Sequence, residues 1–536
     1  MYRLAACRLR LITIGLAAAG ALVIFPLIGW PPVTRVSAVL LAALLLALAV
    51  CRPWRWPRTE FDAIAGWSPS TRAIWTSAFI AGLLLFWFVL TRFHSGDINA
   101  VDFTVYYDRP AYQTLAGRPM FVETADDAMR AQRTYFSVHA HWVMLPLSAL
   151  YAIHASPLWL LALSVVAVVA GAVNILRIVE RFGGGGLVAS ASALAFVLND
   201  NTARTLQYGF HVEVLYAWFV PLAINAALSR RHALFIAAAI ACAAVKEDAF
   251  LLTGAMSLAL AFTALPLMTR RDRVLYLVAP SVIALLNLAF YYGCLLPNLR
   301  PGGVPFYANY WASYGATPGA AMIGMLRSPG RVLARTLTSG FFPTVLAPHL
   351  FLPLAGWRWT LGIVPIVVLY GAADNEQMRS YGIYYSIVLV PFLVIGAAAG
   401  AISVASRVFQ SPTRARLIAA SAIVLGAMLA GFTHAGYSLR PWKPAIAAVP
   451  AALAELSTEP VVLVQSGLYP HAGYEPNVQL LTDDALVDPR NADAVVLLAP
   501  GIGGWPLDDG TLAALARRPP ARNLSHGLIA VRVSGR

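Results

Sequence analysis

Residues 11–30 read LITIGLAAAGALVIFPLIGW, an apolar run of the length that crosses a bilayer as one helix. Similar runs recur along most of the chain, in which 59% of the residues are hydrophobic and 12% are charged. Soluble domains carry roughly 25% charged residues. The composition therefore predicts an integral membrane protein, an all-α polytopic bundle. We interpret 11–30 as its first span, because the run is longer than a signal-peptide core and leads directly into another apolar run.

Hydropathy alone divides the chain into about thirteen transmembrane helices. The predicted spans lie near residues 10–30, 34–51, 73–92, 157–178, 187–199, 211–228, 232–246, 249–268, 274–296, 341–356, 359–373, 382–404 and 416–434.

Arginine-rich segments follow the second, fourth, sixth, eighth and twelfth predicted spans, as cytoplasmic loops do. They are RPWRWPR (52–58), RIVER (177–181), SRRH (229–232), TRRDR (269–273) and RVFQSPTRAR (407–416). This alternation predicts a multi-pass protein of the cytoplasmic (inner) membrane with its N-terminus inside. It also explains the net charge of +14 by contact with anionic membrane lipid, so nucleic acid is not an expected partner.

An odd number of spans places the C-terminal end outside the membrane. We expect a transmembrane domain over residues 1–438, with long outer loops at 93–141 and 297–340, and a small extracytoplasmic α/β domain over 439–536. In this tail, PVVLVQSG, ADAVVLLAP and GLIAVRVSG are β-branched runs typical of strands, and TLAALARR is typical of a helix.

The stretch AVKEDAFLL (244–252) places three charges inside a very apolar region. Residues 233–268 are too long for one span and predict a tight hairpin, whose tip carries these charges at the outer membrane surface. Ionisable groups at this depth indicate a functional site. The expected cluster consists of His139, His141, His211, Glu213, Lys246, Glu247 and Asp248.

Two resemblances indicate a class of enzyme. The first outer loop, DFTVYYDRPAYQTLAGRPMF (102–121), resembles that of GT-C integral-membrane glycosyltransferases, in which an acidic residue near the end of a span acts in catalysis. HAHWVMLPLSALYAI (139–153), FHVE (210–213), KED (246–248) and YGIYYSIVLVPFL (381–393) resemble the predicted membrane-protein family called domain of unknown function 2079. That family is itself thought to be GT-C-like, although its late histidine is missing between Tyr384 and Tyr385 here.

The resemblance implies a glycosyltransferase that uses a polyprenyl-phosphate-linked sugar at the extracytoplasmic face. An inverting transferase needs a carboxylate base and a cation beside the departing phosphate. Asp102 is the first candidate for the base and Asp108 the second, while Lys246 and Arg204 are candidates for the phosphate. The acceptor is a glycan, a lipid or a protein, and the donor is reached from the membrane.

Several alternatives remain open. His139, His141, His211 and Glu213 are candidate ligands of a divalent metal, although residues i and i+2 bind one ion only outside a helix. Tyr307 and Trp311 are candidates for stacking on a sugar, or belong to the aromatic belt at the membrane surface. The chain as a whole could instead be an ion-coupled transporter, a flippase for lipid-linked substrates, or a non-catalytic protein of envelope assembly.

Overall fold

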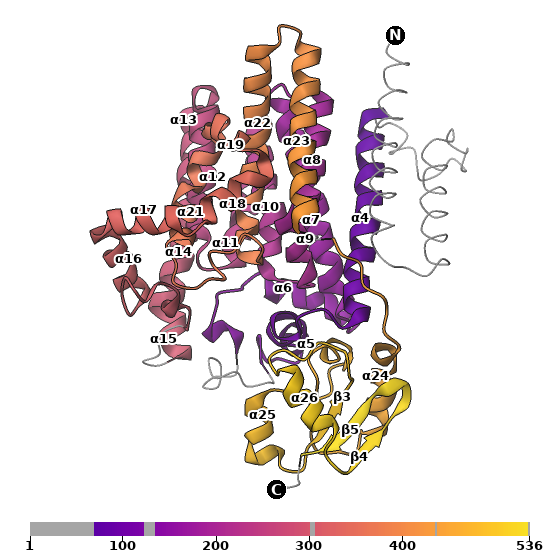
Figure 1. Ribbon diagram of the computed structural model, residues 1–536. Coiled ribbons are helices and arrows are strands. Elements are labelled where there is room, and N and C mark those ends of the chain that lie inside the picture. Colours follow the sequence, from indigo (N-terminus) through magenta and orange to yellow (C-terminus); the bar gives the residue numbers. More distant parts are fainter. Residues whose placement is uncertain (1–68, 123–133, 301–305, 435–436, 534–536) are drawn as a thin grey trace.

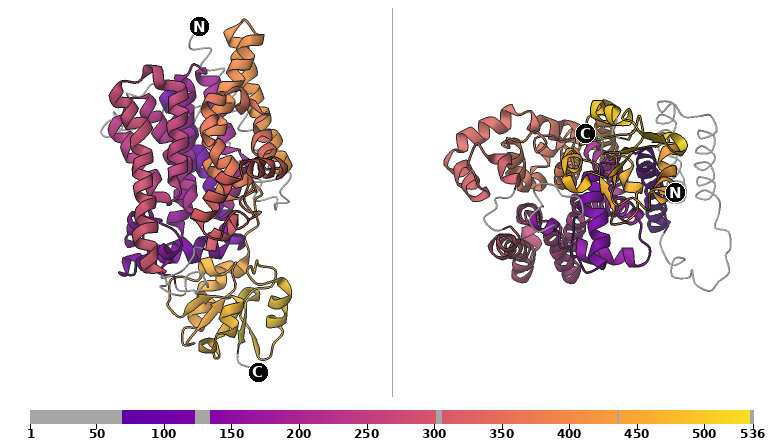
Figure 2. Two further views of the ribbon diagram at one scale, coloured as in Figure 1. Left: turned by 90° about the vertical axis from the view of Figure 1, so that its left-hand side faces the viewer. Right: turned by 90° about the horizontal axis from the view of Figure 1, so that it is seen from below.

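The structure is a computed structural model, and it describes residues 69–122, 134–300, 306–434 and 437–533. The described chain is mostly helical, with the helices gathered into an elongated bundle and a small mixed domain at one end (Figures 1 and 2). The first two predicted spans, at 10–30 and 34–51, lie outside the described residues.

Six helical segments in the described part of the chain are long and apolar enough to cross a membrane. They are Ala73–Ser95, Leu158–Arg181, Ala249–Leu267, Arg270–Leu299, Val390–Val408 and Pro412–Ala430. Shorter apolar helices accompany them at Val212–Leu228, His232–Val245 and Trp357–Gly371. The prediction of about thirteen spans is therefore not confirmed.

Among the described residues, nine helices of the bundle lie at predicted spans. They are α4 (Pro69–Ser95), α7 (Leu158–Arg181), α8 (Gly185–Val197), α10 (Tyr216–Leu228), α11 (His232–Val245), α12 (Ala249–Ala264), α14 (Ala279–Phe290), α22 (Val390–Val408) and α23 (Pro412–His434). The short helix α9 (Asp200–Gln207) lies between two predicted spans. The buried apolar residues of most of these helices form one continuous core.

The predicted span at 341–356 is not one helix. It is divided into α18 (Phe341–Leu346), a 3-10 turn and α19 (Leu352–Ala355), because Leu350 and Phe351 have φ angles of 51° and 55°. A left-handed backbone at two successive bulky residues interrupts the helical hydrogen bonds. The next predicted span is divided similarly into α20 (Trp357–Thr360), a 3-10 turn and α21 (Val364–Gly371).

The second long outer loop, predicted at 297–340, contains regular structure. After α15 (Leu296–Leu299) it forms α16 (Pro318–Arg327) and α17 (Pro329–Thr338). Both helices begin with proline in the first turn, where a missing N–H costs nothing, and the Thr317 hydroxyl accepts a hydrogen bond from the Ala320 N–H. In Figure 1, α17 lies across the direction of the bundle helices.

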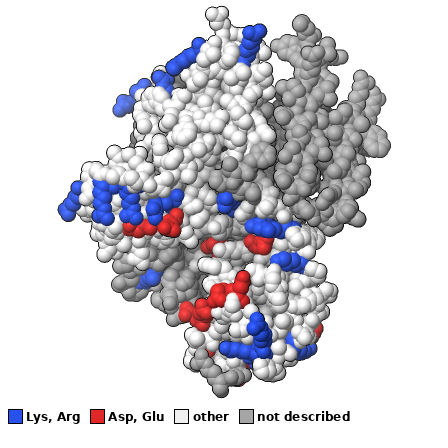
Figure 3. Space-filling view, in the orientation of Figure 1, with Lys and Arg blue, Asp and Glu red and all other residues white. Residues whose placement is uncertain are grey.

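Basic segments gather at the end of the bundle opposite the tail, where α13 (Arg270–Arg273) and the α22–α23 connection lie (Figure 1). Arg416 donates to the Gly183 carbonyl and Arg230 donates to the Leu267 carbonyl, so loops far apart in sequence meet there. On the face shown in Figure 3, this end carries blue Lys and Arg atoms and no red ones. Four of the five predicted basic segments thus lie at one end of the bundle, and the segment at 52–58 lies outside the described residues.

The C-terminal tail contains α24 (Pro444–Glu455) and a five-stranded sheet with strand order β2-β1-β3-β5-β4. The strands are β1 (Val462–Val464), β2 (Val478–Leu480), β3 (Val495–Leu498), β4 (Ala521–Asn523) and β5 (Ile529–Arg532), with helices α25 (Asp483–Val487) and α26 (Asp509–Ala516). Strand β1 is parallel to β2 and β3, and β5 is antiparallel to β3 and β4. The three predicted strands and the predicted helix are confirmed.

Side-chain alternation along the strands divides the tail into two cores. Val462 and Val464 of β1 join the large core that continues into the bundle, whereas Leu463 joins a separate core of the tail. Successive residues of a strand face opposite sides of the sheet. One face of the sheet is therefore packed towards the membrane domain.

The tail touches the end of α4 by backbone contact. A Cβ atom on Gly467 would lie 2.6 Å from the Gly96 carbonyl oxygen, and a Cβ on Gly96 would lie 2.9 Å from the Gly467 carbonyl oxygen. Gly96 also has a φ of 73°, which favours glycine. The Lys443 N–H donates to the His94 carbonyl beside this contact.

Candidate active site

Asp102 lies on a π-helix, η2 (Val101–Asp108), between the end of α4 and α5 (Arg109–Leu115). The Asn99 side chain makes two hydrogen bonds to Asp102 at the start of this π-helix. Asn99 Nδ2 donates to Asp102 Oδ2 at 2.8 Å, and Asn99 Oδ1 accepts from the Asp102 N–H at 3.2 Å. π-Helices are rare and occur frequently at functional sites. The asparagine therefore orients the Asp102 carboxylate while leaving its other oxygen without a hydrogen bond from that side chain.

A buried ionic network lies next to Asp102. His211 precedes a 3-10 turn (Val212–Leu215), and its Nδ1 is hydrogen-bonded to Glu213 Oε2. The other oxygen of Glu213 accepts a hydrogen bond from Lys246 Nζ at 3.0 Å. Only 3% of the Glu213 side chain and 9% of the Lys246 side chain are exposed. The carboxylate thus joins the histidine and the lysine into one unit.

Lys246 lies at the tip of the predicted hairpin, where the backbone is extended (φ −160°, ψ 156°) between α11 and α12. The predicted hairpin is confirmed. Its tip is not simply a water-facing turn, because Lys246 and Glu247 are both buried. Asp248 keeps 46% of its side chain exposed and lies 3.9 Å from Lys246 Nζ.

The HAH segment packs against this tip. His139 Nδ1 lies 2.8 Å from Glu247 Oε1, and the Ala140 N–H donates to Glu247 Oε2 at 2.9 Å. His141 Nδ1 lies 2.6 Å from the Val245 carbonyl oxygen, while its Nε2 is buried without a hydrogen-bond partner. The first outer loop and the hairpin tip therefore form one polar layer.

Electrostatics distinguish the members of this layer. Burial raises the pKa of Asp102, with His211 lowering it and the negative charge of Glu213 raising it further. Burial lowers the pKa of Lys246, but the surrounding carboxylates, Glu213 first, outweigh burial and raise this pKa well above its usual range. Burial, and then the charge of Lys246, lowers the pKa of His139 well below its usual range, so this histidine is neutral. Asp102 is therefore a carboxylate of raised basicity near His211 and Glu213, and Glu213 in turn pairs with Lys246.

The candidate metal ligands do not assemble into a metal site. His139 and His141 each direct Nδ1 towards a protein oxygen, and His211 is bonded to Glu213. Throughout the described ranges, no group of three or more His, Cys, Asp or Glu side chains is placed to hold a metal ion. The residues present do not fit the divalent metal that the sequence left open.

Asp108 lies at the other end of η2 and faces the tail. Its Oδ1 accepts hydrogen bonds from the hydroxyls of Tyr151 at 2.6 Å and Tyr474 at 3.0 Å. The next residue, Arg109, donates to the carbonyls of Gly473 and Val478, both at 2.8 Å. Asp108 is thus separated from the ionic network and joins the membrane domain to the tail.

Arg204 forms an ion pair within α9. Its Nε donates to Asp200 Oδ2 at 2.8 Å, one turn earlier in α9, and one third of its side chain is exposed. Its aliphatic part packs beside Gly382, just before the two adjacent tyrosines. Arg204 therefore lies at the border of the site.

The two aromatic candidates of the second outer loop have different positions. The Trp311 indole N–H donates to the Leu369 carbonyl oxygen at 2.9 Å, which fixes this ring against α21. Tyr307 lies in a 3-10 segment (Phe306–Trp311), and its side chain is outside the described part of the structure.

Four tyrosines belong to the site although sequence reasoning did not select them. Tyr384 stacks on His211 with ring centroids 3.4 Å apart, and the Tyr385 ring lies 5.5 Å from Lys246 Nζ. The Tyr107 hydroxyl lies 3.3 Å from His211 Nε2, and the Tyr135 ring packs on Tyr107. The adjacent pair in YGIYYS was a signal, because a ring beside an ionic residue can stabilise its charge.

The fold and the site together define a polytopic helical membrane protein with a buried ionic layer under a small mixed tail domain. The chain belongs to the predicted membrane protein family DUF2079, which matches residues 97–471. This segment contains all the candidate site residues.

Two solved structures are similar in part, both of ArnT from Cupriavidus metallidurans. The structure bound to undecaprenyl phosphate has a TM-score of 0.47 at 13% identity, and the apo structure has 0.44 at 14% identity. Each alignment covers 88% of this chain and 100% of the other. Because both TM-scores are below 0.5, the likeness carries no functional argument. The search among curated proteins found no match.

Proposed function

We propose that this protein is a GT-C type glycosyltransferase that uses a polyprenyl-phosphate-linked sugar and acts at the extracytoplasmic face of the membrane. The observation that carries the proposal is the convergence of Asp102, His211, Glu213 and Lys246 in one layer beneath the tail. A base and a buried cation are the two groups that inverting sugar transfer needs.

Asp102 acts as the base in this proposal. It accepts the proton of the acceptor hydroxyl while that oxygen forms a bond to the anomeric carbon of the sugar. A carboxylate whose pKa is raised by burial accepts a proton more readily than one in water. Asn99 holds one oxygen of Asp102, so the second oxygen is the one directed to the acceptor.

Lys246 stabilises the departing phosphate. As the bond between the anomeric carbon and the phosphate oxygen breaks, the leaving polyprenyl phosphate gains negative charge. Lys246 Nζ donates to Glu213 in the structure and has two further N–H bonds available for phosphate oxygens. His211 accompanies Glu213 and keeps its carboxylate in place, so the lysine remains oriented towards the donor.

The donor class follows from membrane topology. Nucleotide sugars are confined to the cytoplasm, whereas a lipid-linked sugar reaches an outer site laterally through the bilayer. The basic end of the bundle lies opposite the site and the tail, which supports an outward-facing site by the positive-inside rule. The acceptor is a glycan, a lipid or a protein.

The experiment is transfer of radiolabelled sugar from a panel of polyprenyl-phosphate sugars by the purified protein in lipid. Asp102→Asn and Lys246→Ala are compared with Glu376→Gln, which removes a carboxylate that is 93% exposed. We expect transfer by the wild type and the Glu376 variant and loss in the other two. Transfer that survives both changes would place the reaction elsewhere. Movement of the lipid-linked sugar across the bilayer without any transfer would favour a flippase instead.

A further inference from the structure

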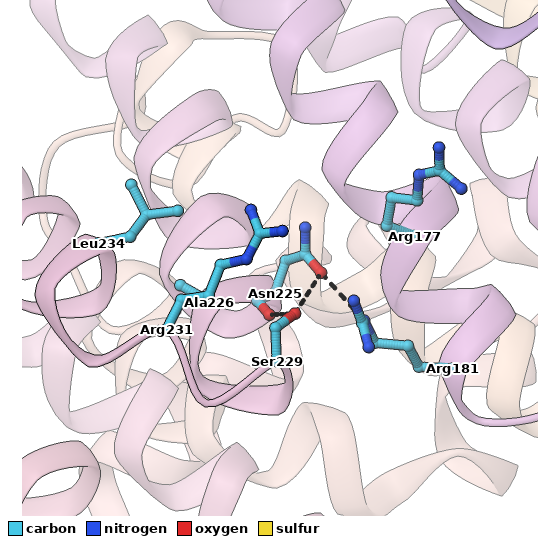
Figure 4. Close-up of a pocket in the computed structure, with 7 residues that line it drawn as sticks. All are labelled: Arg177, Arg181, Asn225, Ala226, Ser229, Arg231 and Leu234. Carbon is cyan, nitrogen blue, oxygen red and sulfur yellow. Dashed lines mark hydrogen bonds between the residues drawn. The ribbon is translucent and has the colours of Figure 1, made fainter. Parts of the chain in front are cut away.

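The basic end of the bundle contains a cavity that the proposed transfer reaction does not use. It has a volume of about 290 Å³ and lies where α7 ends, α10 ends and α11 begins (Figure 4). Its lining residues are Arg177, Arg181, Asn225, Ala226, Ser229, Arg231 and Leu234. This end is opposite the tail (Figure 1), whereas the π-helix of Asp102 is bonded to the tail and Lys246 follows the other end of α11.

Three guanidinium groups surround the polar floor of this cavity. Figure 4 shows Arg231 on one side of Asn225 and Ser229, and Arg177 and Arg181 on the other side. Arg181 Nε donates to Asn225 Oδ1 at 3.2 Å, and the Ser229 hydroxyl donates to the Asn225 carbonyl at 2.6 Å. The arginine is thereby held in a defined orientation by the protein itself.

The charges in this cavity are not balanced by nearby carboxylates in the contacts that the structure records. Arg177 Nη1 donates to Glu180 Oε2 at 3.0 Å, and both side chains are about one third exposed. Arg231 is exposed and precedes α11, whose first turn has no side-chain cap. The free N–H groups of such a turn add partial positive charge. Three arginines and one helix start thus face one carboxylate.

We propose that this cavity binds a phosphate-bearing group at the cytoplasmic surface of the membrane. Arginine forks match phosphate oxygens with two parallel hydrogen bonds, and basic pockets between helices at this surface suit anionic headgroups. The Ser229 hydroxyl already donates to the Asn225 carbonyl, so the arginines supply the donors for a phosphate. A lipid headgroup and a soluble polyphosphate share this chemistry. Leu234, 37% exposed at the rim, favours the lipid.

The test uses the full-length protein in a neutral detergent. Native mass spectrometry measures bound phosphatidylglycerol against phosphatidylcholine, and thermal unfolding measures stabilisation by inorganic pyrophosphate. The Arg177→Gln/Arg231→Gln double variant is compared with Arg407→Gln, which removes an exposed arginine near the end of α22 outside the cavity. We expect the double variant to lose about tenfold or more in apparent affinity, equivalent to 1.4 kcal/mol, and the control to match the wild type.

A gain of binding gives an independent check. Glu180→Gln removes the carboxylate that competes for Arg177, so phosphate affinity should rise several-fold while the fold loses only a surface ion pair. Binding of phosphatidylglycerol alone would identify a lipid site, and stabilisation by pyrophosphate alone would identify a soluble ligand. No binding of either, or equal binding by the double variant and the Arg407 control, would overturn the proposal.

Discussion

Asp102 and Asp108 occupy the two ends of one eight-residue π-helix and have different surroundings. Asp108 accepts hydrogen bonds from two tyrosine hydroxyls, one of them from the tail. The adjacent Arg109 donates hydrogen bonds to carbonyl oxygens of the tail. Asp102 accepts one side-chain hydrogen bond, from the Asn99 amide, and lies near His211 and Glu213. The fold itself uses the hydrogen-bonding capacity of Asp108 and leaves that of Asp102 for another molecule. Two similar carboxylates thus become a structural group and a candidate base.

The largest expected effect separates the two carboxylates by activity. Asp102→Asn should reduce sugar transfer by a factor of about 10² to 10⁴, because the acceptor proton loses its base. Asp108→Asn should retain most of the activity at a temperature where the tail is folded. Initial rates with a labelled donor measure both. An inactive Asp108 variant beside an active Asp102 variant would reverse the comparison.

The ion pair beside Asp102 gives the next effect. Lys246→Ala leaves the Glu213 carboxylate buried without its cation, which costs about 3–5 kcal/mol in comparable pairs. The melting temperature of the purified protein should fall accordingly. The Lys246→Met/Glu213→Gln double variant, which buries no unpaired charge, should recover part of the stability but not the activity. Equal melting temperatures for the wild type and the Lys246 single variant would exclude a stabilising pair.

The burial of Asp108 should make the stability of the protein depend on pH. Burial raises its pKa from 3.8 to about 6, although the two tyrosines and Arg109 lower it. A carboxyl group whose pKa is higher in the folded than in the unfolded protein stabilises the fold fully at a pH below the unfolded pKa. This stabilisation is lost as the pH rises through the folded pKa. This corresponds to about 3 kcal/mol between pH 4 and pH 6. Melting temperatures across this range should show the loss in the wild type and not in Asp108→Asn.

The smallest expected effect concerns the contact between the π-helix and the tail. Tyr474→Phe removes one of the two hydroxyls on Asp108, at a cost of about 1 to 3 kcal/mol for a hydrogen bond to a charged group. Proteolysis of the tail should become faster, while sugar transfer per intact molecule stays the same. Tyr151→Phe is the matched control, since it removes the other hydroxyl on Asp108 and keeps the ring that packs on Tyr474 of the tail. Faster tail cleavage in both variants would show that the contact to the tail is not specific.

The sequence predicted features that depend on neighbours along the chain. Long apolar runs defined α7, α22 and α23, and three charges in an apolar context identified the hairpin tip at Lys246, one of only two lysines in the chain. Hydrogen bonds and electrostatic contacts bring Asp102, the HAH histidines, His211, Glu213 and Lys246 near one another, while the roles assigned to them stay predictions. Each of these residues was unusual for its local surroundings.

The features that escaped prediction depend on distant contacts or on backbone angles. Asp108 is satisfied by Tyr474, 366 residues away, so nothing near it in sequence reveals its structural role. Strands β2 (VQL) and β4 (ARN) lack the β-branched runs that identified β1, β3 and β5 in the sequence. The interruption of 341–356 arises from two left-handed residues within an apolar run, where hydropathy predicts a continuous helix.

The contact between Gly96 and Gly467 fixes the tail against the end of α4. Since neither position has room for a single additional carbon, the tail and the end of α4 meet with their backbones at van der Waals distance, and the Arg109 bonds hold a second point. Two separate attachments prevent rotation about either one. The tail therefore moves with the helices as one body. Under the proposed function, this attachment predicts that a lipid-linked donor exchanges sideways between helices rather than by opening of the tail.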